Sequence, residues 1–87
     1  MRRHFNLFTV YVIYSNSHQV KYTGYTENQE RRLFEHNNGL LGKFTKNKAP
    51  WILIYQEEFS NITEARNREK YLKTGKGREF IRLKTGF

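Results

Sequence analysis

The chain lacks cysteine, contains one proline and has only 8 acidic residues among its 87. Without cysteine, neither a disulfide nor a thiolate-bound zinc ion can hold the fold together. No apolar run approaches the roughly 20 residues that a membrane-spanning helix needs, and the chain does not open with a signal-peptide pattern. A chain of this length has room for one hydrophobic core. We therefore expect one domain over residues 1–87, with the cytoplasm as its default location.

Positive charge is present in excess, because 16 lysines and arginines outnumber 8 acidic residues and give a net charge of +8. Such a bias in a small domain indicates a polyanionic partner, with nucleic acid first and an anionic membrane surface second. The membrane interpretation needs a basic amphipathic helix or a lipid anchor, and the sequence shows neither. A basic protein with no polyanionic partner is the plain alternative. Aromatic residues make up 16% of the chain, which allows stacking on bases.

Hydrophobic periodicity predicts an α+β fold. The first expected strand is apolar on both faces, which is typical of a central strand that is covered on both sides. Strands are expected over residues 8–14, 20–25 and 51–59, and helices over residues 27–37, 62–73 and 78–84. The order β-β-α-β-α-α, in which the first two strands form a hairpin, predicts a small three-stranded sheet of antiparallel type flanked by helices.

Helix ends are predicted from capping residues. Thr26, with Gln29 three positions later, has the form of a capping box and should begin the first helix. Asn61 should cap the second helix through its side chain. The Gly75-Lys76-Gly77 sequence is expected to break the chain between the second and third helices.

Glu69 occupies a position where the second helix would be expected to carry an apolar residue. Ile62, Ala65, Glu69 and Leu72 are spaced so that they share one helix face. Placing a carboxylate on such a face costs several kcal/mol, roughly, unless it is paired, hydrogen-bonded or bound to a cation. One interpretation pairs Glu69 with a neighbouring arginine or lysine at the rim of the core. The other places it in a cleft, where it binds a metal ion.

Further polar and aromatic groups could take part in chemistry. Tyr11 and Tyr22 lie on the two strands of the hairpin, and Gly24 marks a bulge or the close approach of a ligand or another chain. Arg32 and His36 are four residues apart and share a helix face. Each has an ordinary structural explanation: the tyrosines as a packing pair, the glycine as a kink, and the helix face as a solvated one. The question is whether these groups meet in one place.

The order and spacing of these residues resemble the GIY-YIG nuclease superfamily over nearly the whole chain. Thr9-Val10-Tyr11 resembles the first signature, with threonine where the family name has glycine, and Tyr22-Thr23-Gly24 resembles the second. Residues 30–37, with Arg32 and His36 one turn apart, are similar to the family's arginine-bearing helix. We prefer Arg32 to Arg31 because Arg32 shares a face with His36.

The rest of the chain extends the likeness to short stand-alone bacterial members of this superfamily. Residues 65–73 resemble the segment that carries the family's single metal-binding glutamate, here Glu69. Four further segments are similar to motifs of these bacterial proteins: Tyr-Thr-Gly-Tyr-Thr, Arg-Arg-Leu-Phe-Glu-His-Asn, Pro-Trp-Ile-Leu-Ile-Tyr and Lys-Thr-Gly-Lys-Gly-Arg-Glu.

The resemblance implies a divalent-metal-dependent endonuclease of the kind used in DNA repair or recombination. It implies one Mg²⁺ ion held by Glu69, with Mn²⁺ as a substitute and no small-molecule cofactor. Tyr11 would orient or deprotonate the attacking water, and Arg32 and the metal would lower its pKa. Arg32 would also grip the scissile phosphate, Tyr22 would hydrogen-bond the phosphate or the water, and His36 would assist in orientation or proton transfer.

Binding to nucleic acid, with DNA expected, would use surface cations and one glycine. The candidates are Gly24, Lys43, Lys46, Lys48, Lys73, Lys76 and Arg78. Phosphate contacts carry no sequence information, so we expect little sequence specificity, and shape, single-strandedness or a partner protein would have to select the substrate. A catalytically inactive nucleic-acid-binding module of the same fold is the alternative. A basic ribosomal or RRM-type RNA-binding protein is a third interpretation, but an RRM needs a different element order and an aromatic RNP1 strand.

Overall fold

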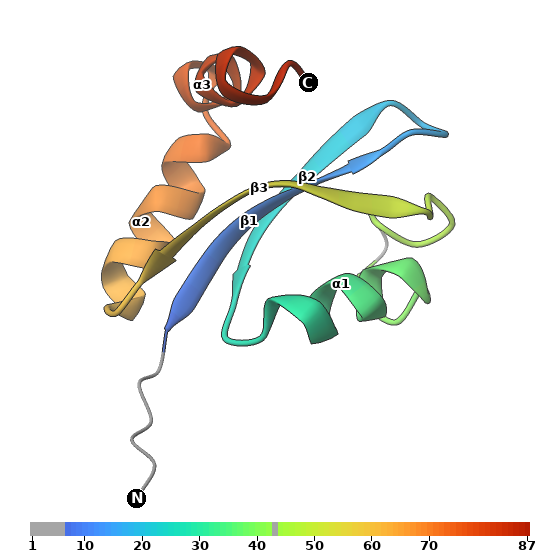
Figure 1. The fold of residues 1–87 in the computed structure, drawn as a ribbon, viewed down its shortest axis with the longest axis horizontal. Helices are drawn as coiled ribbons and strands as arrows, with labels where there is room; N and C mark the ends of the chain where they lie inside the picture. Colours follow the sequence, from blue (N-terminus) through green and yellow to red (C-terminus); the bar gives the residue numbers. More distant parts are fainter. Residues whose placement is uncertain (1–6, 43) are drawn as a thin grey trace, which may run out of the picture.

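The computed structural model describes residues 7–42 and 44–87, and its centre is a three-stranded antiparallel sheet in the order β2-β1-β3 (Figure 1). The strands are β1 (Phe8–Ser15), β2 (Val20–Thr26) and β3 (Trp51–Phe59). The helices are α1 (Gln29–Asn37), α2 (Ile62–Leu72) and α3 (Gly75–Thr85). The fold class and the order β-β-α-β-α-α predicted from the sequence are therefore confirmed.

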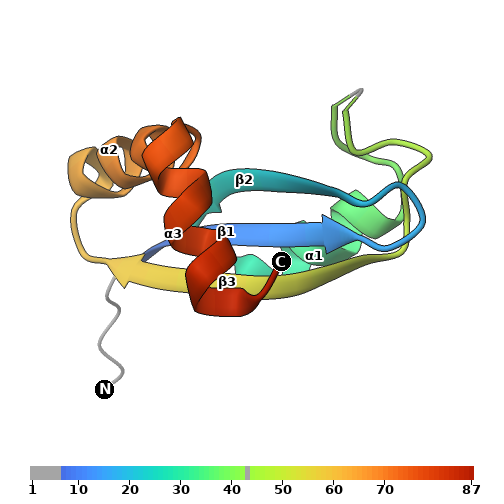
Figure 2. The ribbon, with the colours of Figure 1, turned by 90° about the horizontal axis from the view of Figure 1, so that it is seen from above.

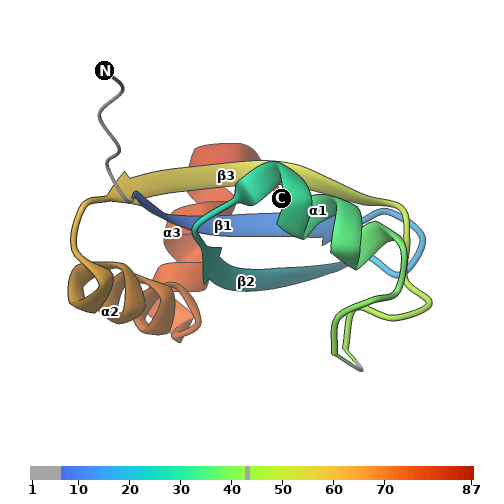
Figure 3. The same cartoon turned by 90° about the horizontal axis from the view of Figure 1, so that it is seen from below.

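Helices cover both faces of the sheet. In Figure 2 α3 crosses in front of the strands, and in the opposite view of Figure 3 α1 lies in front of them. Helix α2 packs on β1 and β2 and leads directly into α3. None of the helices in the described residues has the length and apolar character that would let it cross a bilayer.

Alternate residues of β1 form two separate cores. Val10 and Val12 pack with Ala65, Leu72 and Ile81 of the two C-terminal helices. The residues between them point to the other face, where Tyr11 and Ile13 pack with Trp51. Because both faces are buried, the uninterrupted apolar character of this strand has a structural cause.

The first helix begins later than predicted, and the capping box at Thr26 is wrong. Thr26 stays in β2, paired with Thr9, and its side chain is buried. Asn28 is the N-cap, and its side chain accepts a 3.0 Å hydrogen bond from the backbone N–H of Arg31. The Thr26 hydroxyl instead accepts a 3.1 Å hydrogen bond from the backbone N–H of Asn28, so it shapes the turn that leads into the helix.

The third helix begins earlier than predicted, because the two glycines continue the chain as helix. Thr74 is its N-cap, and the Thr74 hydroxyl accepts a 3.1 Å hydrogen bond from the N–H of Gly77. A Cβ atom on Gly77 would lie 2.1 Å from the carbonyl oxygen of Tyr71. The glycine at position 77 therefore lets the first turn of α3 pack closely against the end of α2. The start of α2 is as predicted, because Asn61 is its N-cap.

The loop between α1 and β3 is tied to the sheet by side chains at both ends. The Asn37 amide donates a 3.2 Å hydrogen bond to the Trp51 carbonyl, and the Asn37 side-chain oxygen accepts one from the Trp51 N–H. The Trp51 indole N–H donates a 3.1 Å hydrogen bond to the carbonyl of Thr45. These contacts carry Thr45 into the interior, where only 2% of its surface is exposed.

Candidate active site

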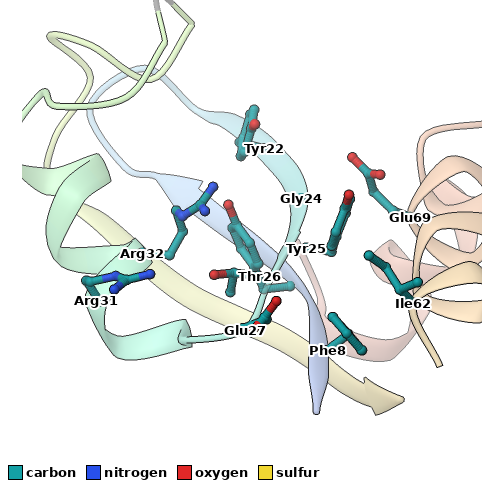
Figure 4. Close-up of a pocket in the computed structure, with 11 residues that line it drawn as sticks. Phe8, Tyr22, Gly24, Tyr25, Thr26, Glu27, Arg31, Arg32, Ile62 and Glu69 are labelled. Atoms are coloured by element: carbon teal, nitrogen blue, oxygen red, sulfur yellow. The ribbon is translucent and has the colours of Figure 1, made fainter. Parts of the chain in front are cut away.

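A cavity of ≈ 570 Å³ brings together side chains that are far apart in the sequence (Figure 4). Figure 4 shows the arginines of α1 on one side of β2 and Glu69 of α2 on the other, with Tyr22 and Gly24 between them. The lining residues are Phe8, Tyr11, Tyr22, Gly24, Tyr25, Thr26, Glu27, Arg31, Arg32, Ile62 and Glu69. Of the five predicted catalytic residues, four line this cavity, and the fifth, His36, contacts the Tyr11 hydroxyl.

Tyr11 reaches the cavity from the centre of the sheet. The residue is fully buried and stands opposite Gly24 in the register of β1 and β2. A Cβ atom on Gly24 would lie 2.7 Å from the Tyr11 hydroxyl oxygen. The atoms that approach Gly24 closely therefore belong to the Tyr11 ring of the same hairpin, which the sequence did not predict. The predicted bulge is not at Gly24: the register shift lies between Val12 and Ile13 on the β3 side. A contact between Gly24 and nucleic acid stays a prediction.

His36 is buried and not part of a solvated helix face. Its Nε2 atom lies 2.9 Å from the Tyr11 hydroxyl oxygen, and its Nδ1 atom lies 3.0 Å from the Thr45 hydroxyl oxygen. The Thr45 hydroxyl donates a 2.8 Å hydrogen bond to the carbonyl of Leu41. Both nitrogen atoms of the imidazole are thus held by hydrogen bonds, which fixes the ring orientation.

The pKa values of this pair shift in opposite directions. Burial, together with the neighbouring Tyr22, raises the pKa of Tyr11 well above its ordinary value of 10.0, and Arg32 opposes this only in part. Arg32 lowers the Tyr11 pKa, as expected from the sequence, but desolvation of the buried ring is the larger effect, so the net shift is upward. Burial and then Arg32 lower the pKa of His36 below 6.5, so its imidazole is neutral at pH 7.

Tyr22 is half-buried and packs against aromatic neighbours. Its ring centroid is 6.3 Å from that of Tyr11 and 5.0 Å from that of His36. The ring of Phe44 is stacked on it at 6.0 Å with an interplanar angle of 29°. The two tyrosines therefore do form a packing pair, and in addition Tyr22 lines the cavity.

Arg32 presents the more enclosed of two neighbouring guanidinium groups. Its side chain is 32% exposed, against 63% for Arg31, and both residues line the cavity. Its Nε atom lies 3.5 Å from a Glu35 carboxylate oxygen but is buried without a hydrogen bond to the described residues. A buried N–H donor that lacks an acceptor costs free energy. The side chain as a whole is partly exposed and lines the cavity, so its guanidinium can meet an anionic oxygen there.

Glu69 pairs with a lysine, as the first interpretation of its position predicts, and it also lies in a cavity, where the second interpretation would have it bind a metal ion. Its carboxylate accepts a 2.7 Å hydrogen bond from Nζ of Lys73, the residue that caps the C-terminal end of α2. The Glu69 side chain is 17% exposed and lines the cavity, while Lys73 is 51% exposed. Because an exposed lysine chain can swing into solvent, the ion pair does not seal the carboxylate from a metal ion.

The donor set suits a hard cation that keeps most of its water. Within residues 7–42 and 44–87, no three His, Cys, Asp or Glu side chains gather closely enough to form a metal cage. Mg²⁺ is commonly bound by one or two carboxylates, with waters and substrate phosphates completing its shell. A single carboxylate on a cavity of this size fits that requirement.

The residues predicted to contact nucleic acid fall on two surfaces. Lys73 and Arg78 line a second cavity of ≈ 400 Å³, whose walls include Tyr22, Phe44 and Lys21. In the loop, Lys46 is exposed, whereas Lys48 lies 4.6 Å from the Phe44 ring centroid and donates a hydrogen bond to the Phe44 carbonyl. Lys76 is exposed in the first turn of α3, and Lys43 lies outside the described residues.

Comparison with known proteins shows the family of this chain. A family model described as "GIY-YIG catalytic domain" matches residues 7–81. A UPF0213 protein of Staphylococcus haemolyticus is 45% identical over 65 residues, which are 75% of this chain and 78% of that protein. One of Clostridium perfringens is 48% identical over 52 residues, covering 60% of this chain and 56% of that protein.

A solved structure is similar as well. The solution NMR structure of a UPF0213 protein from Bacillus halodurans matches with a TM-score of 0.55 at 30% identity. The match covers 92% of this chain and 87% of that one. Since the family model spans nearly all of the sheet and the helices, the chain belongs to the GIY-YIG catalytic domain family.

Proposed function

We propose that this protein is a divalent-metal-dependent endonuclease that hydrolyses phosphodiester bonds in nucleic acid, with DNA as the expected substrate. The observation that carries the proposal is the meeting of Tyr11, Tyr22, Arg32 and Glu69 on one cavity. Three separate segments of the chain supply these groups: the hairpin, α1 and α2. The net charge of +8 supports a polyanionic substrate.

Arg32 is the group that would hold the scissile phosphate. Phosphodiester hydrolysis needs neutralisation of the charge that builds on the phosphate oxygens. A planar guanidinium can donate two hydrogen bonds to such oxygens, and the partly exposed Arg32 side chain lines the cavity. Tyr22, beside it in the cavity, would donate its phenol proton to the same phosphate or to the attacking water.

Glu69 is the residue that would hold a metal ion, with Mg²⁺ expected and Mn²⁺ as a substitute. Lys73 would have to leave the carboxylate when the ion binds. The bound ion would supply Lewis-acid stabilisation for the phosphate and for the departing oxygen. Its remaining ligands would be waters and substrate oxygens, because the described residues offer no further acidic or imidazole cluster.

Tyr11 would orient the attacking water and receive its proton. Because burial keeps the phenol protonated, Tyr11 can accept a proton only if it gives up its own. The neutral His36 imidazole, 2.9 Å away, is the acceptor. The water oxygen then bonds to phosphorus, the phosphorus–oxygen bond to the leaving group breaks, and the leaving oxygen takes a proton from solvent.

A cleavage assay with matched variants tests the proposal. Purified wild type, Glu69→Gln and Glu69→Ala are incubated with duplex, branched and single-stranded DNA and with RNA, in Mg²⁺, Mn²⁺ or EDTA. We expect metal-dependent cutting by the wild type and a loss of at least about a hundredfold in both variants. If the wild type binds nucleic acid equally well but cuts none of these substrates with either metal, the inactive binding module is the correct interpretation.

Tyr11→Phe tests the role of the phenol more narrowly. The substitution removes one hydroxyl group and keeps the buried ring, so the fold should be preserved. We expect a fall of about 10² to 10⁴ in the cleavage rate with little change in nucleic-acid affinity. A cleavage rate equal to that of the wild type would remove Tyr11 from the mechanism.

A further inference from the structure

Thr45 is a buried hydroxyl group that sequence reasoning did not single out. It lies in the loop between α1 and β3, and 2% of its surface is exposed. Its hydroxyl contacts one titratable group, the Nδ1 atom of His36, at 3.0 Å. Since His36 in turn contacts the Tyr11 phenol, Thr45 is the third member of a buried hydrogen-bond chain that ends at the candidate active site.

The direction of this chain follows from the Leu41 carbonyl. A threonine hydroxyl has one proton, and a carbonyl oxygen can only accept. The Thr45 hydroxyl lies 2.8 Å from the Leu41 carbonyl oxygen and donates its proton there. Toward His36 the hydroxyl oxygen must therefore accept, so the proton of the neutral imidazole is on Nδ1.

The Nε2 atom of a neutral imidazole protonated on Nδ1 carries a lone pair. The Tyr11 phenol, 2.9 Å away, is then the donor in the Tyr11–His36 hydrogen bond. The Tyr11 oxygen is then an acceptor toward the cavity, where it can accept from the Arg32 guanidinium and from a water molecule. In the opposite tautomer, Nε2–H would donate to the Tyr11 oxygen, and the phenol proton would have no base to receive it.

We propose that Thr45 is a positioning residue that fixes His36 as the Nδ1–H tautomer and so makes Nε2 the acceptor of the Tyr11 proton. The tautomer is a property of the folded protein alone, while its catalytic consequence rests on the proposed endonuclease function. On transfer of the phenol proton to Nε2, the imidazole becomes a cation whose Nδ1–H still donates to Thr45. The same threonine thus stabilises the ring before and after the transfer.

The backbone of Thr45 is held separately from its hydroxyl. Its carbonyl accepts the 3.1 Å hydrogen bond from the Trp51 indole, and Trp51 is fastened to Asn37 through its backbone. Thr45→Val removes the hydroxyl and keeps the shape of the side chain, so the loop should stay in place. Thr45→Ser keeps the hydroxyl and loses one methyl group. Thr63→Val, on the exposed side of α2, is the matched control.

Ring ¹⁵N chemical shifts of His36 at neutral pH test the tautomer directly, without any cleavage assay. Histidine signals are assigned with His4→Gln and His18→Gln variants. We expect a protonated Nδ1 and an unprotonated Nε2 in the wild type, in Thr45→Ser and in Thr63→Val. In Thr45→Val we expect the signals to move toward the Nε2–H form. An Nε2–H tautomer in the wild type, or unchanged signals in Thr45→Val, overturns the assignment of Thr45.

Cleavage kinetics then separate this inference from the proposed function. We expect Thr45→Val to lower kcat about 10- to 100-fold with KM little changed, and Thr45→Ser to restore most of the rate. If the wild type fails to cleave while its tautomer depends on Thr45 as described, the proposed function fails and the assignment of the hydrogen-bond chain stands. Equal kcat values in Thr45→Val and wild type overturn the catalytic consequence.

Discussion

A Cβ atom on Gly24 would lie 2.7 Å from the hydroxyl oxygen and 2.9 Å from the Cζ atom of Tyr11. Real Cβ atoms are essentially never found so close to another heavy atom, so any side chain at position 24 must displace the Tyr11 ring or the strand. Tyr11 is fully buried between β2, β3 and α1, which leaves its ring little room to retreat. The glycine therefore determines where the phenol oxygen lies.

Gly24→Ala should lower the cleavage rate strongly while nucleic acid still binds. A displacement of about 1 Å in a reacting group can cost roughly a hundredfold in rate, and we expect a loss of that order. Steady-state cleavage and binding titrations measure the two effects separately. Gly75→Ala is the control, because a Cβ atom there meets nothing within 4 Å. Wild-type cleavage by Gly24→Ala would show that the phenol position is unimportant.

Lys73→Met should tighten metal binding in the absence of nucleic acid. The Lys73 ammonium lies 2.7 Å from a Glu69 oxygen, so it competes with a cation for the carboxylate. Half-exposed ion pairs contribute little, and we expect the Mn²⁺ dissociation constant to fall by up to about fivefold. Titration followed by Mn²⁺ electron paramagnetic resonance measures it, with Lys70→Met on the same helix as control. A weaker affinity in Lys73→Met would contradict this competition.

The pH dependence of kcat should show an acidic limb below pH 6.5. Burial and Arg32 lower the pKa of His36 below its ordinary value of 6.5, so the imidazole is neutral at pH 7 and can accept the Tyr11 proton. As the pH falls through the lowered pKa, the imidazole is protonated and the rate declines. Cleavage rates measured at saturating metal over a range of about pH 5 to 8, which spans the ordinary histidine pKa, test this expectation.

His36→Gln tests whether the acidic limb belongs to His36. This variant should be slower by about 10² to 10⁴ and should lose the limb. If the limb persists in His36→Gln, another group titrates.

The Glu57–Arg68 pair should make stability depend on pH in the acidic range. Arg68 donates two 2.9 Å hydrogen bonds to the Glu57 carboxylate from α2 to β3. Burial alone would raise the Glu57 pKa, but the hydrogen bonds from Arg68 and Tyr55 lower it below 4.5. A lowered folded-state pKa means that the stabilisation is present above the unfolded-state pKa and is lost as the pH falls through the folded-state value.

Glu57→Gln measures this contribution. At pH 7 we expect the variant to lose ~1–3 kcal/mol in the free energy of unfolding by urea, and near pH 3 the difference should shrink. Glu58→Gln, at the exposed neighbouring position, is the control. A difference between wild type and Glu57→Gln that stays constant from pH 7 to pH 3 would contradict the linkage.

Gly77→Ala should destabilise the packing of α3 on α2. The added Cβ atom would lie 2.1 Å from the Tyr71 carbonyl oxygen and 2.4 Å from the Leu72 Cα atom, both backbone atoms that cannot rotate away. We expect a loss of about 3 kcal/mol and a fall in Tm of roughly 10 °C or more. Thermal unfolding followed by circular dichroism measures it. Gly75→Ala, two residues earlier in the same turn, should leave Tm near the wild-type value.

The strands and the helix order could be predicted because their patterns are local and repetitive. The apolar residues on both faces of β1 reflect its central place in the sheet. The cap of α2 is local as well, because the Asn61 side chain accepts from the backbone N–H of Glu64, three residues later. The cap at Asn28 could not be predicted, since it is the pairing of β2 with β1 that keeps Thr26 in the strand and delays the helix. The earlier start of α3 depends on the contact between Gly77 and Tyr71, which spacing along the chain does not show.

The candidate site shows the same division. Tyr11, Tyr22, Arg32 and Glu69 were found through residue type and spacing, and the structure places them on one cavity. Thr45 was missed because it lies in a loop without periodicity, and its contact with His36 depends on the path of that loop. That burial outweighs Arg32 in setting the Tyr11 pKa could not be predicted for a related reason: it depends on how completely the ring is enclosed, which the sequence does not state.

Tyr22 belongs to the walls of both cavities, the one that contains Glu69 and the one that contains Arg78. A nucleic-acid strand that occupied both cavities, as the proposed function would require of a substrate that spans them, would contact the Tyr22 ring from two sides. A substitution at this position should change affinity and turnover together, and a second substitution in either cavity should not add to it independently.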